Sequence, residues 1–125
     1  MKIRIQKNSI RFRLKQPEVN QFQQGGTVAE VLEFGGNANE QLTFALEAFD
    51  EPAITIKFQN NKTTIFVPSK LAEEWTTTDL VGFDGKIDTG KGQTINILVE
   101  KDFVCMDGRE EDNAGSYPNP LMNKV

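Results

Sequence analysis

Hydrophobic and polar residues alternate with a period of two along most of this chain, which predicts short strands with one buried face. Eight such runs span 2–6, 10–15, 27–34, 42–48, 54–58, 63–67, 80–86 and 94–101. Within the third run, Val28, Leu32 and Phe34 are expected to face the core. Two further segments, 17–22 and 70–75, carry apolar residues at helical spacing and predict short helices.

The predicted elements follow the order strand, strand, helix, strand, strand, and the same order then repeats. Residues in matching positions lie about 53 apart, so that Leu14 matches Val67 and Phe22 matches Trp75. This spacing indicates an internal repeat, although two ββα units could also resemble each other by chance. Either way, the pattern predicts an α+β fold with about eight short antiparallel strands, arranged as a curved sheet or an open barrel. The two helices would cover apolar surface, and Trp75 is expected to be buried.

The first hairpin contains three of the chain's four arginines. With a turn at Asn8 and Ser9, Arg4 would lie directly opposite Arg13. Like charges in opposed positions destabilise a sheet, so such a row needs carboxylates, an anion or open water beside it. Guanidinium groups bind phosphate and carboxylate oxygens in pairs and stay charged. The residues that could bind an anion on this face are Lys2, Arg4, Arg11, Arg13 and Lys15.

Three glutamates occupy polar positions of predicted strands, namely Glu33, Glu47 and Glu100. We expect them to serve as acidic partners of the basic row. Alternatively, they could ligate a metal ion or form an acid/base pair. Their spacing along the chain does not decide between these roles, because the order of the strands in the sheet is not given by the sequence.

The composition is that of a globular domain spanning residues 1–125, with 38% hydrophobic and 26% charged residues. No apolar run approaches the roughly 18 residues of a membrane helix, and the basic, alternating start is unlike a signal peptide. The only cysteine, Cys105, fits a reducing compartment. We therefore expect a cytoplasmic protein without a membrane partner.

Charge is distributed unevenly along the chain, whose net charge is −4. The first fifteen residues carry six basic groups and no acidic group. The acidic total disfavours nucleic-acid binding. Histidine is absent, which removes the commonest general base and metal ligand. The sequence therefore identifies no catalytic residue, metal site or cofactor.

Regular patterning stops after Phe103, and residues 104–125 are expected to form an irregular tail that docks on the sheet. Phe103, Tyr117 and Leu121 would hold this tail against the core, and the prolines of the 117–120 segment prevent a regular helix. Cys105 is interpreted as a packing residue rather than a reactive thiol. The acidic run 107–112 lacks the spacing of a calcium loop and is interpreted as solvated.

The opening MKIRI and NSIRFRL segments, together with the closing LVEKDFVC and YPNP segments, resemble the two ends of a family of small, uncharacterised bacterial proteins. This resemblance covers essentially the whole chain and implies a single bacterial domain, but no activity. A more distant likeness is to triphosphate-tunnel enzymes, which are eight-stranded barrels lined by alternating Arg, Lys and Glu. Their Glu-x-Glu-x-Lys motif is absent, since the matching positions are Lys2, Arg4 and Gln6.

Two functional hypotheses follow. In the first, the protein is not an enzyme and its basic sheet face binds an anionic ligand, such as a phosphate-containing small molecule, or an acidic protein. In the alternative, the chain is a metal-dependent hydrolase of phosphorylated small molecules with a tunnel-like barrel. A concave cavity that holds Arg4, Arg13 and at least two glutamates would favour the hydrolase, whereas an open face would favour binding alone.

Overall fold

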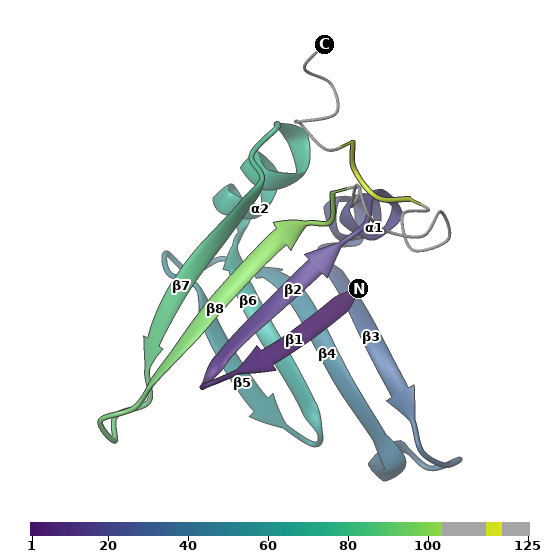
Figure 1. Cartoon of the computed structure of the whole chain (residues 1–125), viewed down its shortest axis with the longest axis vertical. Helices are drawn as coiled ribbons and strands as arrows, with labels where there is room; N and C mark the ends of the chain where they lie inside the picture. Colours follow the sequence, from purple (N-terminus) through teal and green to yellow (C-terminus); the bar gives the residue numbers. More distant parts are fainter. Residues whose placement is uncertain (104–114, 119–125) are drawn as a thin grey trace.

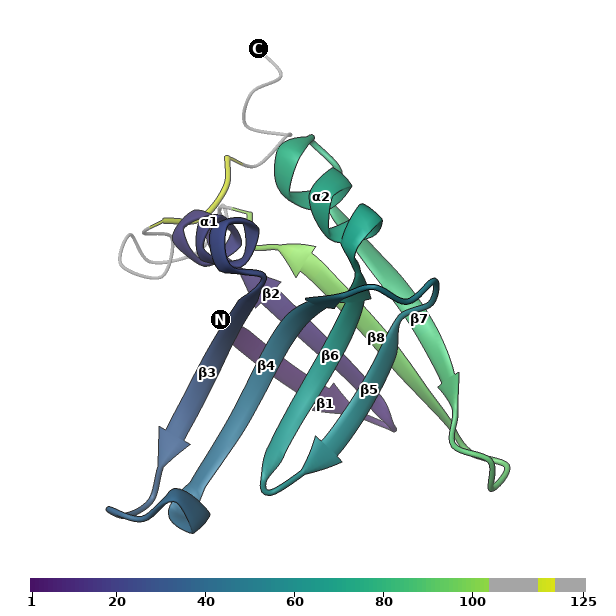
Figure 2. The ribbon, with the colours of Figure 1, turned by 180° about the vertical axis from the view of Figure 1, so that it is seen from behind.

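Two four-stranded sheets face each other in the computed structural model, which describes residues 1–103 and 115–118 (Figures 1 and 2). Sheet A has the order β1-β2-β8-β7 and contains Lys2–Gln6 (β1), Ser9–Leu14 (β2), Gly82–Asp88 (β7) and Thr94–Lys101 (β8). Sheet B has the order β3-β4-β6-β5 and contains Thr27–Glu33 (β3), Gln41–Phe49 (β4), Thr55–Gln59 (β5) and Lys62–Pro68 (β6). The helices Gln16–Gly25 (α1) and Ser69–Thr77 (α2) cover one end of the pair of sheets (Figure 1). A short 3-10 turn, Ala38–Glu40, precedes β4.

The α+β class, the eight strands and the two helices agree with the sequence prediction. The pairing is not antiparallel throughout, however, because β2 with β8 and β4 with β6 are parallel. The two sheets also remain separate and do not close into a barrel. Hydrophobic alternation shows which residues share a face of a strand, but it carries no information about which strands become neighbours, so the central parallel pairs could not be predicted.

The internal repeat is confirmed by the structure. The helices begin at Gln16 and Ser69, 53 residues apart. The parallel register obeys the same spacing, since Arg13 pairs with Glu100 in sheet A and Phe66 pairs with Glu47 in sheet B. Each sheet combines the hairpin of one half with the later strand pair of the other half. Neither sheet can therefore be completed by one half of the chain alone.

The first hairpin has a different register from the one expected. Its turn is formed by Lys7 and Asn8, which both adopt positive φ values of 46° and 61°, as the two-residue turns of twisted hairpins require. Arg4 consequently pairs with Arg11, and Arg13 pairs with Lys2. The expected pairing of Arg4 with Arg13 was wrong by two residues. Because that shift is an even number, the basic and apolar faces remain as predicted.

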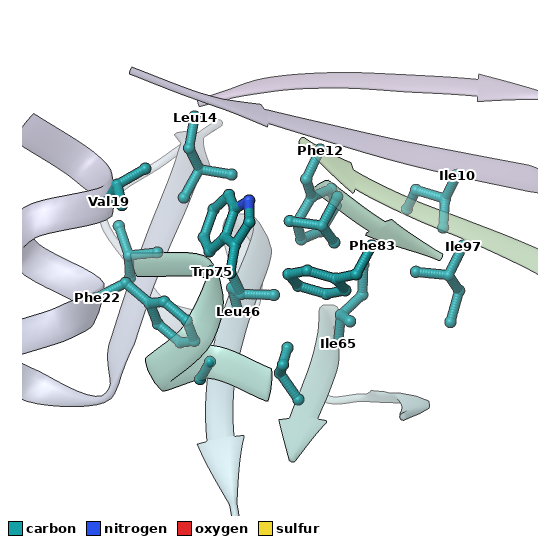
Figure 3. Close-up of a cluster of buried hydrophobic side chains, with 14 residues drawn as sticks. Ile10, Phe12, Leu14, Val19, Phe22, Leu46, Ile65, Trp75, Phe83 and Ile97 are labelled. Carbon is teal, nitrogen blue, oxygen red and sulfur yellow. The ribbon is translucent and has the colours of Figure 1, made fainter. Parts of the chain in front are cut away.

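The core lies between the two sheets and beneath the helices (Figure 3). Trp75 is completely buried, as predicted, and its ring meets those of Phe22 and Phe83 at centroid distances of 6.1 and 5.3 Å. The indole nitrogen donates a hydrogen bond to the carbonyl of Val81 at 3.1 Å. Trp75 thus joins α2 to α1 and to sheet A without leaving its polar atom unpaired.

The two sheets bury less at the end opposite the helices. Several side chains on the inward positions of strands are exposed there, including Leu32 at 56% and Phe58 at 70%. Phe34, just beyond β3, is 71% exposed. The prediction that Leu32 and Phe34 lie in the core was therefore wrong, because these residues extend past the region where sheet A covers sheet B. Val28, the third residue of that prediction, is buried as expected.

Residues 115–118 run beside the start of α1. The backbone nitrogen of Gln16 donates to the carbonyl of Gly115 at 3.0 Å, and that of Tyr117 donates to the backbone carbonyl of Asp102 at 2.7 Å. The ring of Tyr117 packs against that of Phe103, with centroids 5.9 Å apart. Residues 104–114 and 119–125 lie outside the described residues, and with them the predictions for Cys105, the acidic run 107–112, Pro120 and Leu121.

No helix in the described ranges has the length and apolar character needed to cross a membrane.

Candidate functional site

The outer face of sheet A, turned away from sheet B, carries most of the basic residues of the first hairpin. Residues that pair across the four strands place their side chains in rows perpendicular to the strands. One row runs Arg4, Arg11, Leu98, Asp84, and its neighbour toward the hairpin turn runs Gln6, Ser9, Asn96, Lys86. A third row, on the helix side, runs Lys2, Arg13, Glu100, Gly82. On these four strands, five cationic side chains face outward against three carboxylates.

A groove of about 370 Å³ lies across the first two rows. The groove is deepest at its centre, where the middle strands contribute the short side chains of Ser9 and Asn96. Longer side chains surround these two residues. Arg4 and Arg11 stand at one end, and the opposite end is formed by β7. The groove is open to solvent, so the arginines of the first hairpin lie on an open face rather than in an enclosed cavity.

Glu100 is the carboxylate that neutralises part of this face. Its Oε1 accepts a hydrogen bond from Nε of Arg13 at 2.7 Å and lies 3.8 Å from Nε of Arg11. One carboxylate therefore forms ion pairs with two guanidinium groups. Because the distance to Arg11 is the longer one, Arg11 is only weakly paired. We predicted that at least one of the three glutamates would lie beside the arginines, and Glu100 does so.

Arg4 differs from its neighbours. Its Nη2 donates a hydrogen bond to Oε1 of Gln6 at 3.1 Å, and within residues 1–103 and 115–118 no carboxylate lies within ion-pair distance of it. It is also the direct cross-strand partner of Arg11. Two guanidinium groups in opposed positions repel each other, so an anion between them would remove an unfavourable interaction as well as add a favourable one.

The remaining predicted basic residues lie outside the groove. The ammonium group of Lys2 forms an ion pair with the buried carboxylate of Asp102 at 3.1 Å. Lys15 precedes α1 as its N-cap residue, and its backbone nitrogen donates to Oε1 of Glu18 at 2.9 Å. Its side chain lies near Gly115 rather than in the row. Lys15 was therefore assigned to the basic row wrongly, because β2 ends at Leu14.

Glu33 and Glu47 belong to sheet B and face away from sheet A. Glu33 accepts a hydrogen bond from Gln41 at 3.4 Å. The structure therefore places the three candidate glutamates on two different faces of the molecule. The described part of the chain contains no group of three or more His, Cys, Asp or Glu side chains arranged to hold a metal ion.

Sequence reasoning missed the residues that complete the groove from the second half of the chain, namely Asp84, Lys86, Asn96 and Leu98. Each stands at an alternating position of a run that was correctly predicted as a strand. The missing information was the parallel pairing of β2 with β8, which brings this strand pair beside the first hairpin.

A second polar cluster involves the buried Lys101, but it lies at the helix end of sheet A. Its ammonium group donates to the carbonyl of Thr78 at 2.7 Å and lies 5.4 Å from the ring centre of Tyr117. Burial lowers the pKa of Lys101 below its usual value, against the opposing effect of Asp79. These contacts attach residues 115–118 to the end of α2, which indicates a role in the fold.

The fold and the site together define an α+β protein in which a repeated ββαββ unit forms two interlocked mixed sheets, one with a cationic outer face. The chain belongs to the family of unknown function DUF7009, whose model matches residues 1–121. This membership confirms the expectation of an uncharacterised family that extends over essentially the whole chain. Comparisons with curated proteins and with solved structures gave no match.

Proposed function

We propose that the protein binds a small organic anion, with a phosphate or carboxylate group, in the groove on the outer face of sheet A. The observation that carries this proposal is the opposed pair Arg4 and Arg11 at one end of the groove. Glu100 neutralises Arg13 at close range and reaches Arg11 only at 3.8 Å. The anion would occupy the space between the two guanidinium groups.

The shape of the groove favours a small molecule over an acidic protein. Its volume of about 370 Å³ falls within the range typical of small-ligand sites. Hydrogen-bonding groups from Gln6, Ser9 and Asn96 line it beside the arginines. These neutral groups would fix the orientation of a ligand whose charge is held by Arg4 and Arg11.

Binding without catalysis is the form of the proposal that these residues support. A metal-dependent hydrolase would require several free carboxylates beside the arginines to hold the ion. Glu33 and Glu47 lie on the other sheet, and Glu100 is paired with Arg13. We also propose a cytoplasmic location, which is supported by the single cysteine of the chain.

A thermal-shift titration with pyrophosphate and with citrate tests the proposal. A ligand that binds only the folded state raises the melting temperature as its concentration increases. We expect such a rise for the wild type and its loss in Arg4→Gln and Arg11→Gln. Ligand-free Arg4→Gln should be as stable as the wild type or more stable, because the substitution removes a repulsion.

The matched control is Lys57→Gln. Lys57 occupies the position on sheet B that corresponds to Arg4 on sheet A, 53 residues later. This variant should retain the full ligand-dependent rise. Equal losses in Arg4→Gln and Lys57→Gln would show a general effect of charge, and an unshifted wild type at millimolar ligand would contradict the proposed binding.

A further inference from the structure

The groove on sheet A has different charges at its two ends. Its central row begins with Arg4 on β1 and Arg11 on β2, continues with Leu98 on β8, and ends with Asp84 on β7. Adjacent strands are about 4.8 Å apart, so the backbone positions of Arg4 and Asp84 are separated by roughly 14 Å. The row therefore presents two cations, an apolar residue and a carboxylate in that order.

Asp84 has no cationic partner within ion-pair distance among the described residues. The nearest basic residue on its own strand is Lys86, which belongs to the neighbouring row and pairs with Asn96. No ion pair within 4.0 Å joins Asp84 to Lys86 or to either arginine. A carboxylate at this position weakens the attraction of the groove for a simple anion, so it is not explained by anion binding alone.

We propose that the groove selects a small amphoteric ligand: one with a phosphate or carboxylate at one end and an amino group at the other. This inference rests on the function proposed above and specifies the class of ligand. The anionic group lies between Arg4 and Arg11, and the ammonium group donates a hydrogen bond to Asp84. The carbon skeleton between them crosses Leu98, which supplies an apolar contact at the centre of the row.

The neighbouring row is compatible with this orientation. Gln6 and Ser9 lie beside the cationic end, whereas Asn96 lies beside Leu98 and can bond hydroxyl groups of the skeleton. Lys86 lies at the same end of the groove but in the neighbouring row, where it pairs with Asn96. Arg4 and Arg11 thus disfavour a polyamine, and Asp84 disfavours a ligand that is long enough to place a second anion beside it.

The test uses two sugar phosphates that differ at one substituent. Glucosamine 6-phosphate carries an ammonium group where glucose 6-phosphate has a hydroxyl, and calorimetric titration measures the dissociation constant of each. For the full-length wild type we expect the amino sugar phosphate to bind about tenfold more tightly, as a charge-assisted hydrogen bond would give. In Asp84→Asn this preference should disappear, with the affinity for glucose 6-phosphate unchanged or higher.

The control is Asp88→Asn, a change at an outward position of the same strand that faces Thr94 and lies outside the groove. It should keep the tenfold preference. Equal binding of both sugar phosphates to the wild type would overturn the amphoteric selectivity and leave the anion site intact. Failure of both sugar phosphates to bind, together with failure of pyrophosphate, would instead contradict the proposed function itself.

Discussion

The two outer faces of this molecule occupy equivalent positions in the repeat but differ in chemistry. The row that contains Arg4 and Arg11 on sheet A corresponds to Lys57 and Thr64 on sheet B. Both faces have a shallow groove over these positions, of about 370 and 380 Å³. On sheet B two lysines face outward against two glutamates, whereas on sheet A five cations face outward against three carboxylates.

The inner faces of the two halves resemble each other more closely. Phe22 and Trp75 occupy equivalent positions of the two helices, and both are essentially buried. Leu14 and Val67, also equivalent, are completely buried. Packing constrains side-chain volume and polarity in the same way in both halves, whereas a solvated face tolerates substitution. The concentration of arginine on one face is therefore not required by the fold, which is why we assign binding to sheet A.

The core provides the largest expected effects. Trp75→Ala should lower the free energy of unfolding by about 3–5 kcal/mol, because it removes a completely buried ring. Phe22→Ala, at the equivalent position, should cost a comparable amount. Urea unfolding followed by circular dichroism measures both. A loss below about 1 kcal/mol for Phe22→Ala alone would show that the two halves do not share one core.

Gly85 of β7 and Glu30 of β3 pair with equivalent residues, Ile97 and Phe44, yet they face different neighbours. A Cβ atom at Gly85 would overlap Cγ2 of Ile54, whereas Glu30 accepts a hydrogen bond from the amino group of Met1 at 2.7 Å. Gly85→Ala should therefore destabilise the fold by about 1–3 kcal/mol. Adding Ile54→Ala should cost less in that background than alone, and strict additivity in the double-mutant cycle would exclude the contact.

Glu100 and Glu47 form the third comparison. Glu100→Gln should destabilise the fold by about 1 kcal/mol more than Glu47→Gln, because it leaves Arg11 and Arg13 without their shared carboxylate. The effect is small because the side chain of Arg13 is 40% exposed, so that water screens its ion pair. The difference should shrink as salt increases. Equal effects of the two substitutions would mean that the arginines do not depend on Glu100.

The smallest effect concerns pH. Burial lowers the pKa of Lys101 below 10.5, so the unfolded chain binds more protons than the folded chain between the two values. Stability therefore gains a contribution as pH rises through the lowered pKa, and this gain is complete above 10.5. Comparing the wild type with Lys101→Met at pH 7 and pH 10 isolates it, because Tyr117, whose pKa is raised by burial, is present in both. If the free energy of unfolding of the wild type, relative to that of the variant, decreased from pH 7 to pH 10, the lowered pKa of Lys101 would be contradicted.

Much of the local structure could be predicted from the sequence, because alternation and turn residues act over short distances. The strands, the helices, the burial of Trp75 and the common face of Arg4, Arg11 and Arg13 all follow from such local rules. The groove could not be predicted, since it depends on the parallel pairing of β2 with β8, whose paired residues are 87 positions apart in the chain. The hairpin register was missed because Lys7 adopts a positive φ, which few residues other than glycine and asparagine favour.

The central claim, that the repeat carries an anion site on one face only, is tested most directly by a nuclear magnetic resonance titration of the labelled protein with pyrophosphate. Three pairs of equivalent residues serve as internal comparisons: Gln6 with Gln59, Arg11 with Thr64, and Asn96 with Thr43. We predict saturable shifts of the backbone amides of Gln6, Arg11 and Asn96, with their partners on sheet B unmoved. Saturable shifts of similar size on both faces, or larger shifts on sheet B, would contradict the account.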